Sequence, residues 1–268
     1  MQIVPPTTLP MRLSKWHALG NDYLLVEPGE LTAPLTPGGV RRLCDYHYGV
    51  GSDGLLEVTA VDGASADVRI WNPDGSTAEL SGNGVRIVAA WLSRLSGETH
   101  VAIRVAGRKL AADVRDEQIV LDVGVVEVAS PEQIDLGDER VEFIPVSVGN
   151  PHAVVRREPE RGELRRLGPR IERHIRFPER TNVQLVRVDG EHELTVGVWE
   201  RGAGETLSSG TSAVAAAAAA VAEKWCTSPV RVRLPGGELT VELDGEGRAL
   251  LTGPAEQICT IEVPEQPT

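Results

Sequence analysis

The chain has 268 residues, of which 41% are hydrophobic, 25% are charged and 4% are aromatic. This composition supports one large or two medium cores and excludes a disordered, collagenous or coiled-coil protein. The net charge of −12 and the unclustered 27 Lys and Arg argue against a nucleic-acid partner, and no apolar run reaches the roughly 18 residues of a membrane span.

The opening sequence MQIVPPTTLP lacks the charged start and the apolar centre of a secretory signal peptide. The three cysteines, Cys44, Cys226 and Cys259, are odd in number and do not have the spacing of zinc ligands. This pattern favours a reducing compartment and cysteines packed as small apolar side chains. We therefore expect a cytoplasmic protein that does not hold a metal.

The first half of the chain is predicted to begin with an apolar strand over residues 23–27. A second strand over residues 67–71 has apolar residues at alternate positions and ends in Trp71. A Gly-rich turn then leads into a helix of small residues over 85–95. Two further strands are expected around Gly107.

The second half of the chain repeats this order, with strands over 153–156 and 194–199, a helix over 213–224 and two strands around residues 236–237. A shift of 128 or 129 residues aligns the two halves in constant order. The matching positions are Gly20-Asn21 and Gly149-Asn150, Val68 and Val196, Trp71 and Trp199, Ser81-Gly82 and Ser209-Gly210, Arg104 and Arg233, Gly107 and Gly236, and Leu110 and Leu239. We therefore expect two similar lobes related by a pseudo-twofold axis.

The lobes are expected to cover residues 11–128 and 129–256, with 257–268 as a segment that could return to the first lobe. Residues 130–140, which contain Pro, Gly and several charges, are predicted to cross between the lobes. The mixture of strands and helices indicates the α+β class. A cleft between two lobes is the expected ligand site.

The predicted helix of the second half contains ten residues, AVAAAAAAVA at 213–222, that favour a helix and carry no polar group. A helix that is apolar all round must be enclosed by the rest of the protein. Each lobe is therefore expected to be a curved mixed β-sheet wrapped around one central helix.

Both central helices are predicted to begin with a short hydroxyl and glycine motif. The motifs are SGNG at 81–84 and SGTS at 209–212. Free backbone N–H groups and the positive end of the helix dipole make such a start an anion site, and the pseudo-twofold axis would bring the two starts face to face. The alternative is that Ser and Asn are ordinary N-caps and Gly is ordinary turn material.

Asparagine is scarce in this chain, with five residues where an average frequency of about 4% would give about eleven. All five lie in Gly-rich turns, which favours a pocket lined by amides, although some are also common turn residues. A neighbouring pair, Glu200 and Arg201, offers a carboxylate for an ammonium group and a guanidinium for a carboxylate. The asparagines are Asn21, Asn72, Asn83, Asn150 and Asn182.

Taken together, these stretches resemble diaminopimelate epimerase over residues 13–253. The similar motifs are LGNDY at 19–23, GVGSDGLL at 49–56, NPDGSTAELSGNG at 72–84, GNPH at 149–152, TNV at 181–183, ERGAGET at 200–206 and SGT at 209–211. The resemblance implies inversion of one α-carbon of diaminopimelate without a cofactor, on the route to lysine and peptidoglycan. It also implies an amino-acid ligand and a homodimer.

In that family, two cysteines at the helix starts take a proton from one face of the α-carbon and deliver one to the other. The matching positions are Ser81 and Ser209, and His152 and Glu200 match the groups that flank the cysteines. Gly54 stands where some members have Gln. The resemblance further implies substrate-binding side chains at Asn21, Asn72, Asn150, Asn182, Glu200 and Arg201, and backbone donors at Gly82, Asn83, Gly210 and Thr211.

Serine at both catalytic positions changes the expected chemistry. A thiol has a pKa of about 8.5, which a helix start and a cationic neighbour can lower, whereas a serine hydroxyl titrates several units higher. A general base works best when its pKa lies near the working pH. We therefore expect little or no inversion by this chain.

Three explanations of the serine pair remain open. The chain is a Cys-to-Ser variant of an ordinary epimerase, a natural paralogue that binds an amino acid or catalyses another reaction, or a weakly active enzyme in which serine acts directly. A binding or regulatory protein without catalysis is the main alternative class. The sequence does not decide between these explanations.

Overall fold

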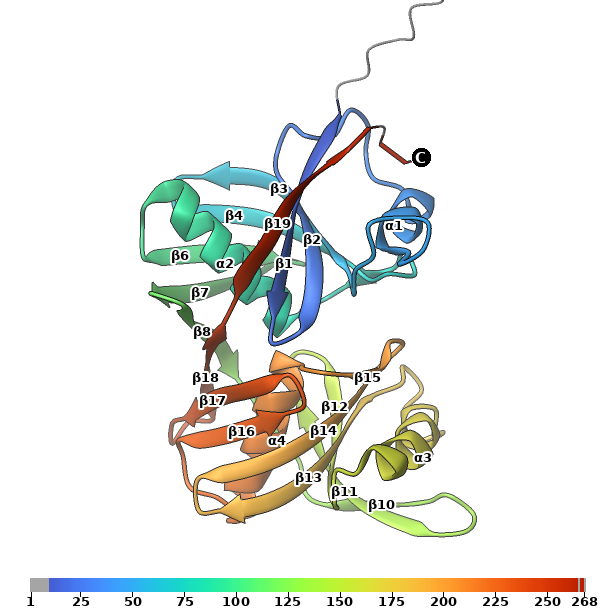
Figure 1. Ribbon diagram of the computed structural model, residues 1–268. Coiled ribbons are helices and arrows are strands. Elements are labelled where there is room, and N and C mark those ends of the chain that lie inside the picture. Colours follow the sequence, from blue (N-terminus) through green and yellow to red (C-terminus); the bar gives the residue numbers. More distant parts are fainter. Residues whose placement is uncertain (1–9, 265, 268) are drawn as a thin grey trace, which may run out of the picture.

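The computed structural model describes residues 10–264, 266 and 267, so the expectation drawn from the opening residues falls almost wholly outside it. Figure 1 shows two groups of elements, one above the other. The first half of the chain forms β1 (Met11–Ala18), β2 (Asn21–Val26), α1 (Pro37–Cys44), β3 (Leu55–Asp62), β4 (Ser65–Trp71), β5 (Thr77–Ala78), α2 (Gly82–Ser96), β6 (His100–Val105), β7 (Arg108–Arg115), β8 (Gln118–Val125) and β9 (Glu127–Val128).

The second half contains the same kinds of element in the same order, with one additional strand, β10, at its start. It forms β10 (Glu132–Asp135), β11 (Arg140–Ser147), β12 (Pro151–Arg156), α3 (Arg161–Glu172), β13 (Asn182–Gly190), β14 (Glu193–Glu200), β15 (Gly204–Thr206), α4 (Gly210–Ala222), β16 (Val230–Leu234), β17 (Gly237–Leu243), β18 (Arg248–Pro254) and β19 (Glu256–Val263).

Strand pairing confirms the duplication that the sequence indicates, because adding ten to a strand number in the first half gives its counterpart. The pairs β2–β3 and β4–β6 are parallel, as are β12–β13 and β14–β16. The antiparallel series β6–β7–β8 likewise matches β16–β17–β18. The fold is therefore α+β, with two lobes of mixed sheet related by a pseudo-twofold axis.

The two lobes are joined by strands that each half contributes to the other. Strands β8 and β18 pair antiparallel across the boundary, so their hydrogen bonds make one continuous sheet of the two lobes. Strand β19 from the end of the chain pairs with β1, and β9 pairs with β11. The end strand of each half thus completes the sheet of the other half.

The segment 130–140 does not cross between the lobes, so that prediction was wrong. Its residues Glu132–Asp135 form β10, which pairs antiparallel with β11 inside the second lobe. The chain changes lobe earlier, after β8, since the next strand, β9, already pairs with β11. Pro131 and the charges at 138–140 belong to the borders of a hairpin and not to a linker.

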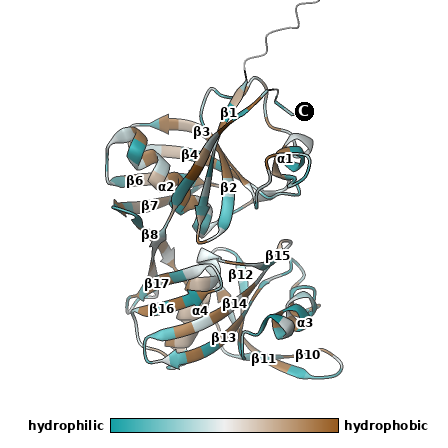
Figure 2. Ribbon diagram, in the orientation of Figure 1, coloured by the Kyte–Doolittle hydropathy of each residue, from teal (hydrophilic) through white to brown (hydrophobic). Residues whose placement is uncertain are grey.

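The central helices are enclosed, as the sequence predicts. Every residue of α4 from Gly210 to Ala220 is buried, and so is every residue of α2 from Gly82 to Leu92. Alanine side chains let the sheet approach α4 from all sides, and Figure 2 shows this helix in pale to brown colours, in contrast to the largely hydrophilic α3. Apolar residues of both central helices belong to one core that extends through the two lobes.

Two outer helices, α1 and α3, were not predicted. Each covers the sheet face opposite the central helix, α1 through Val40 and Leu43 and α3 through Leu164 and Leu167. Their hydrophobic stripes are short and are interrupted by Gly and Arg, so the sequence pattern is weak. No helix in the described residues has the length and apolarity needed to cross a membrane.

The cysteines follow the sequence prediction only in part. Cys44 and Cys226 are buried as small apolar side chains, but Cys259 is exposed on β19. Most side chains of β19 are exposed, so Cys259 shares the environment of its neighbours on this strand.

The enclosure of α4 leads to a test of stability. Replacing the fully buried Ala216 with Leu should lower the free energy of unfolding by about 1 to 3 kcal/mol, because a close-packed core has no room for three more carbon atoms. The matched control is Ala222→Leu at the exposed end of the same helix, which should change it by less than about 0.5 kcal/mol. Urea unfolding measures both, and equal losses would contradict the enclosure of α4.

Candidate active site

The first turns of α2 and α4 meet at the boundary between the lobes (Figure 1). A Cβ atom built on Gly82 would lie 3.0 Å from the Cα of Gly210, which is tighter than most side-chain contacts. Glycine at both positions therefore permits this contact without a shift of the backbone. The free N–H groups and the positive dipole ends of two helices therefore gather in one small region, which suits an anionic group.

Ser81 precedes α2 as its N-cap and lies in a network of neutral groups. Its Oγ accepts a hydrogen bond from the Gly84 N–H at 3.0 Å and lies 3.0 Å from the hydroxyl of Tyr23. Tyr23 is buried, and burial raises its pKa well above the ordinary value of a phenol. Both hydroxyls are therefore protonated at neutral pH.

Ser209 occupies the equivalent position before α4, but its partner is different. Its Oγ does not cap the helix and instead donates a hydrogen bond to Oε2 of Glu200 at 3.1 Å. Burial raises the pKa of Glu200, while the hydrogen bond from Ser209 acts in the opposite direction. The ionisable group beside this helix start is thus a carboxylate and not the serine.

Two asparagines connect the lobes around the helix starts. The Nδ2 of Asn83 donates to Oδ1 of Asn21 at 2.9 Å and to the carbonyl of Ser208 at 2.9 Å. Asn21 in turn donates to Oδ2 of Asp53 at 2.9 Å. Because Ser208 belongs to the second lobe, the Asn83 amide holds both helix starts in a fixed relation.

His152 is held inside the second lobe by two amide side chains. Nε2 of Gln184 donates to its Nδ1 at 3.0 Å, which leaves Nε2 of His152 to donate to Oδ1 of Asn150 at 2.9 Å. Burial lowers the pKa of His152 to about 3, so the imidazole is neutral at pH 7. The structure therefore pairs the buried His152 with the half-buried Asn150.

Other predicted residues brace the surrounding loops. Asn182 donates to the carbonyl of Pro151 at 3.0 Å and accepts the backbone N–H of Arg201 at 3.0 Å. The amide of Asn72 donates to Ser76 Oγ at 2.9 Å. These contacts fix the loops that carry the side chains of Asn72 and Arg201.

A cavity of about 700 Å³ lies next to these groups and is lined by residues of both lobes. Of the predicted residues, it is lined by Asn21, Asn72, Glu200 and Arg201. Tyr23 also lines it, and Tyr23 and Glu200 each hydrogen-bond one of the two serines. The helix starts therefore lie directly behind the wall of this cavity.

Several residues of the cavity were missed by the sequence analysis. Tyr23 stands at the repeat offset of 129 from His152, so the alignment of the two halves could have indicated it. Asp53 belongs to the GVGSDGLL motif. Gly54 makes room for the Tyr23 ring, since a Cβ there would lie 2.6 Å from Cε1 of Tyr23, and a Gln at this position would require the ring to move.

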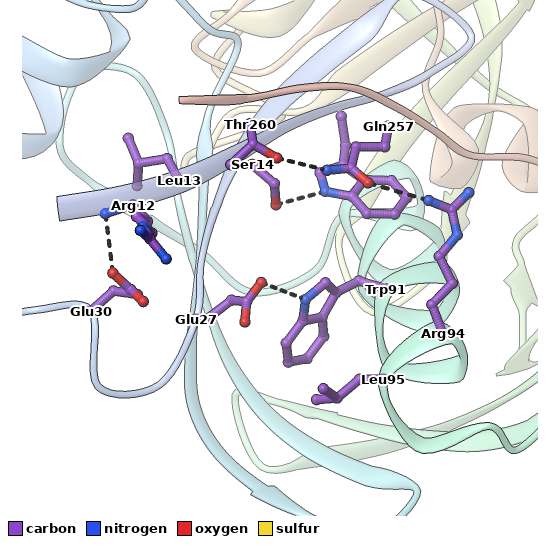
Figure 3. Close-up of a pocket in the computed structure, with 11 residues that line it drawn as sticks. Arg12, Leu13, Ser14, Glu27, Glu30, Trp91, Arg94, Leu95, Gln257 and Thr260 are labelled. Carbon is purple, nitrogen blue, oxygen red and sulfur yellow. Dashed lines mark hydrogen bonds between the residues drawn. The ribbon is translucent and has the colours of Figure 1, made fainter. Parts of the chain in front are cut away.

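A second hollow, of about 390 Å³, lies on the first lobe, between β1, β19 and the far end of α2 (Figure 3). Its polar groups are already paired: Trp91 Nε1 donates to Glu27, the backbone N–H of Arg12 donates to Glu30, and Arg94 donates to Gln257. It contains none of the predicted site residues. The cavity between the lobes is therefore the stronger candidate.

The described residues include no group of three or more His, Cys, Asp or Glu side chains arranged to hold a metal. One lysine, Lys15, lies near the cavity, with Nζ 2.7 Å from Oδ2 of the cavity residue Asp22 and 2.8 Å from the carbonyl of Gly51. Its ammonium group is thus engaged as a structural cation.

The neutral state of His152 predicts a pH dependence of stability. Its pKa is lower in the folded protein, about 3, than the ordinary value of 6.5, so the unfolded chain binds an extra proton as the pH falls through this window. The free energy of unfolding should therefore decrease from pH 6.5 downwards. His152→Gln should make that decrease shallower by up to about 1.4 kcal/mol per pH unit.

Urea unfolding of the parent and of His152→Gln over the acid range measures this effect. The control is His192→Gln, which changes an exposed histidine far from the site and should keep the slope of the parent. Equal slopes for the parent and His152→Gln would contradict the buried neutral state.

The diaminopimelate epimerase family model matches this chain over residues 13–129 and 144–258. The diaminopimelate epimerases of Stutzerimonas stutzeri (strain A1501) and Pseudomonas fluorescens (strain Pf0-1) are each 38% identical to it over 267 residues. Each alignment covers 92% of this chain and 97% of the relative.

Two solved structures show the same fold at low sequence identity. A hydroxyproline epimerase from Agrobacterium vitis with bound trans-4-hydroxy-L-proline has a TM-score of 0.74 and 19% identity, with 95% of this chain and 92% of that chain covered. A PhzF-family phenazine biosynthesis protein from Bacillus anthracis has a TM-score of 0.69 and 15% identity, with 96% and 99% covered. These two establish the fold, and the family match with the closer relatives establishes the ancestry: the chain belongs to the diaminopimelate epimerase family.

Proposed function

We propose that the chain binds diaminopimelate, or a closely similar amino acid, in the cavity between the lobes. The observation that carries the proposal is the meeting of two helix starts at Gly82 and Gly210 behind a cavity of about 700 Å³. The α-carboxylate would be held by the free N–H groups of these starts. The α-carbon would then lie between Ser81 and Ser209.

The charges of the cavity support a ligand with both ammonium and carboxylate groups. Asp22, Asp53 and Glu200 contribute carboxylates, and Arg180 and Arg201 contribute guanidinium groups. Ion pairs with both signs of charge select a zwitterion over a simple acid or amine. A diamino diacid carries this combination at each end.

We further propose that the Ser81 and Ser209 chain inverts the α-carbon slowly or not at all. Inversion needs a base on one face and a proton donor on the other. Ser81 is hydrogen-bonded to the neutral Tyr23, and Ser209 donates a hydrogen bond to Glu200, so both hydroxyls keep their protons and neither is an alkoxide base. The cost of forming an alkoxide, about 1.4 kcal/mol for each pKa unit, exceeds what positioning is expected to recover.

A member of the family that binds an amino acid, or catalyses another isomerisation, is the second candidate. The Ser209–Glu200 hydrogen bond favours it, because it leaves a buried carboxylate as the ionisable group at one helix start. One fold can also host several reactions, and the solved structures with this fold include a hydroxyproline epimerase and a PhzF-family protein.

We also propose that the protein works without pyridoxal phosphate, because Lys15 is bound to Asp22 and the other two lysines lie outside the cavity. A homodimer in the cytoplasm is the proposed assembly and location. Light scattering of the purified protein tests the assembly state.

Calorimetry with diaminopimelate tests the pocket. Arg201→Ala and Asn182→Ala should each weaken binding by about 1.5 to 3 kcal/mol, since the first removes a charged partner and the second frees the loop that carries it. His192→Ala, at an exposed residue outside the site, should leave the affinity unchanged. The same affinity for all three variants would overturn the assignment of the pocket.

Restoring two thiols tests the chemistry. The double change Ser81→Cys and Ser209→Cys should create or restore interconversion of the LL and meso isomers, because thiols reach the thiolate state near neutral pH. Each single change should at most exchange the substrate α-proton in D₂O, since one thiol cannot serve both faces. Deuterium incorporation and isomer analysis measure the two steps separately.

Two outcomes of this experiment would contradict the proposal. Rapid inversion by the unchanged Ser81 and Ser209 chain would show that the argument from hydroxyl pKa is wrong. A folded double-cysteine variant that does not bind diaminopimelate would assign the cavity to another ligand.

A further inference from the structure

A buried arginine on α2 lies behind the helix starts and takes no part in the proposed chemistry. The side chain of Arg86 is fully buried. It donates to Oδ1 of Asn83 at 2.9 Å, to the carbonyl of Gly82 at 3.3 Å and to the carbonyl of Pro254 at 3.4 Å. In the described part of the chain no carboxylate forms an ion pair with it, and the one cause that shifts its pKa, to about 10, is burial.

The position of Arg86 is unfavourable for an isolated protein. It lies in the second turn of α2, near the positive end of that helix dipole. A Cβ built on Gly210, the first residue of α4, would be 3.0 Å from its NH1 atom, so the guanidinium also lies beside the second helix start. Burying an unpaired cation among positive dipole ends is costly unless an anion compensates for it.

Arg86 also determines the orientation of the amide that links the lobes. Because it donates to Oδ1 of Asn83, the Nδ2 group of Asn83 must point the other way, to Asn21 and Ser208. Among the described residues, Arg86 is the one charged partner of this amide, so losing the guanidinium would remove the contact that fixes which end of the amide is the oxygen. Arg86 therefore controls the relation between the two helix starts through Asn83.

We propose that Arg86 is a positioning residue whose buried charge is compensated by the α-carboxylate of the ligand and whose hydrogen bond fixes Asn83. This inference deepens the proposed function and rests on it. The guanidinium supplies a fixed positive charge behind the helix starts without touching the ligand. This charge favours a ligand with a carboxylate at the reacting carbon over a ligand with a neutral group there. Removal of the α-proton places more negative charge on that carboxylate, so the guanidinium should stabilise the ligand with its α-carbon deprotonated still more.

The test compares two ligands that differ in this charge, LL-diaminopimelate and its diamide. Calorimetry gives the ratio of their dissociation constants for the parent and for three variants: Arg86→Gln, Arg86→Lys and Arg94→Gln. Arg94 is the matched control, an exposed arginine on the same helix whose contacts are with Gln257 and the Trp16 ring. A ratio is used because a general loss of stability would weaken both ligands alike.

Arg86→Gln should reduce the preference for the carboxylate ligand by about tenfold or more, whereas Arg94→Gln should leave it unchanged. Arg86→Lys keeps the positive charge but loses the planar guanidinium that donates to Asn83. This variant should therefore keep most of the preference for the carboxylate ligand while binding both ligands more weakly. If Arg86→Gln does not fold, as judged by its thermal melt, the lysine variant decides. If Arg86→Lys lost the preference for the carboxylate ligand over the diamide, the inference would be overturned.

The outcomes separate this inference from the function on which it rests. A parent that binds neither ligand overturns the proposed function and the inference together. A parent that binds diaminopimelate, with a folded Arg86→Gln variant that keeps the full preference, overturns the inference alone. The inference alone is also overturned if the parent binds diaminopimelate and its diamide with equal affinity.

Discussion

The close contact between the first turns of α2 and α4 is the constraint on which the rest of the structure depends. Glycine at positions 82 and 210 leaves room for the two helix starts to approach this closely, and the contact also needs both helices to be held from behind. The enclosing sheets provide that support, and the β8–β18 pairing fixes one lobe against the other. The amide of Asn83 then connects the two starts directly. A ligand site that uses backbone N–H groups from two lobes needs all of these features at once.

The backbone of the site is symmetric, but its side chains are not. Ser81 is bonded to a phenol and Ser209 to a carboxylate, at positions that the duplication makes equivalent. The duplication therefore gives two equivalent helix starts at the boundary between the lobes, each with its own acid–base neighbour. Inversion of one carbon requires such a pair, because its two faces carry out opposite proton transfers. In this chain the two equivalent positions carry serine hydroxyls, whose protons are hard to remove.

Much of the fold could be predicted from the sequence, because the repeat and the apolar alternation report on burial. The enclosed α4 follows from ten residues without a polar group, and the two helix starts follow from the matched Ser-Gly motifs. The features that could not be predicted depend on contacts between residues that are distant in the chain. The segment 130–140 looks like a linker by composition, yet β11 provides it with a hairpin partner. The role of Tyr23 depends on Gly54, about thirty residues away, which leaves space for its ring.

The exchange of end strands between the lobes has a consequence for synthesis of the chain on the ribosome. Strand β1 at residues 11–18 obtains its edge partner, β19, from residues 256–263, near the end of the chain. The first lobe therefore leaves the ribosome with one edge of its sheet unpaired, and it cannot reach its final form until residues 256–263 have been made. The second lobe receives β9 from upstream and has its edge strand before its own core is made. The two lobes thus differ in when their edge strands become available, although their folds are equivalent.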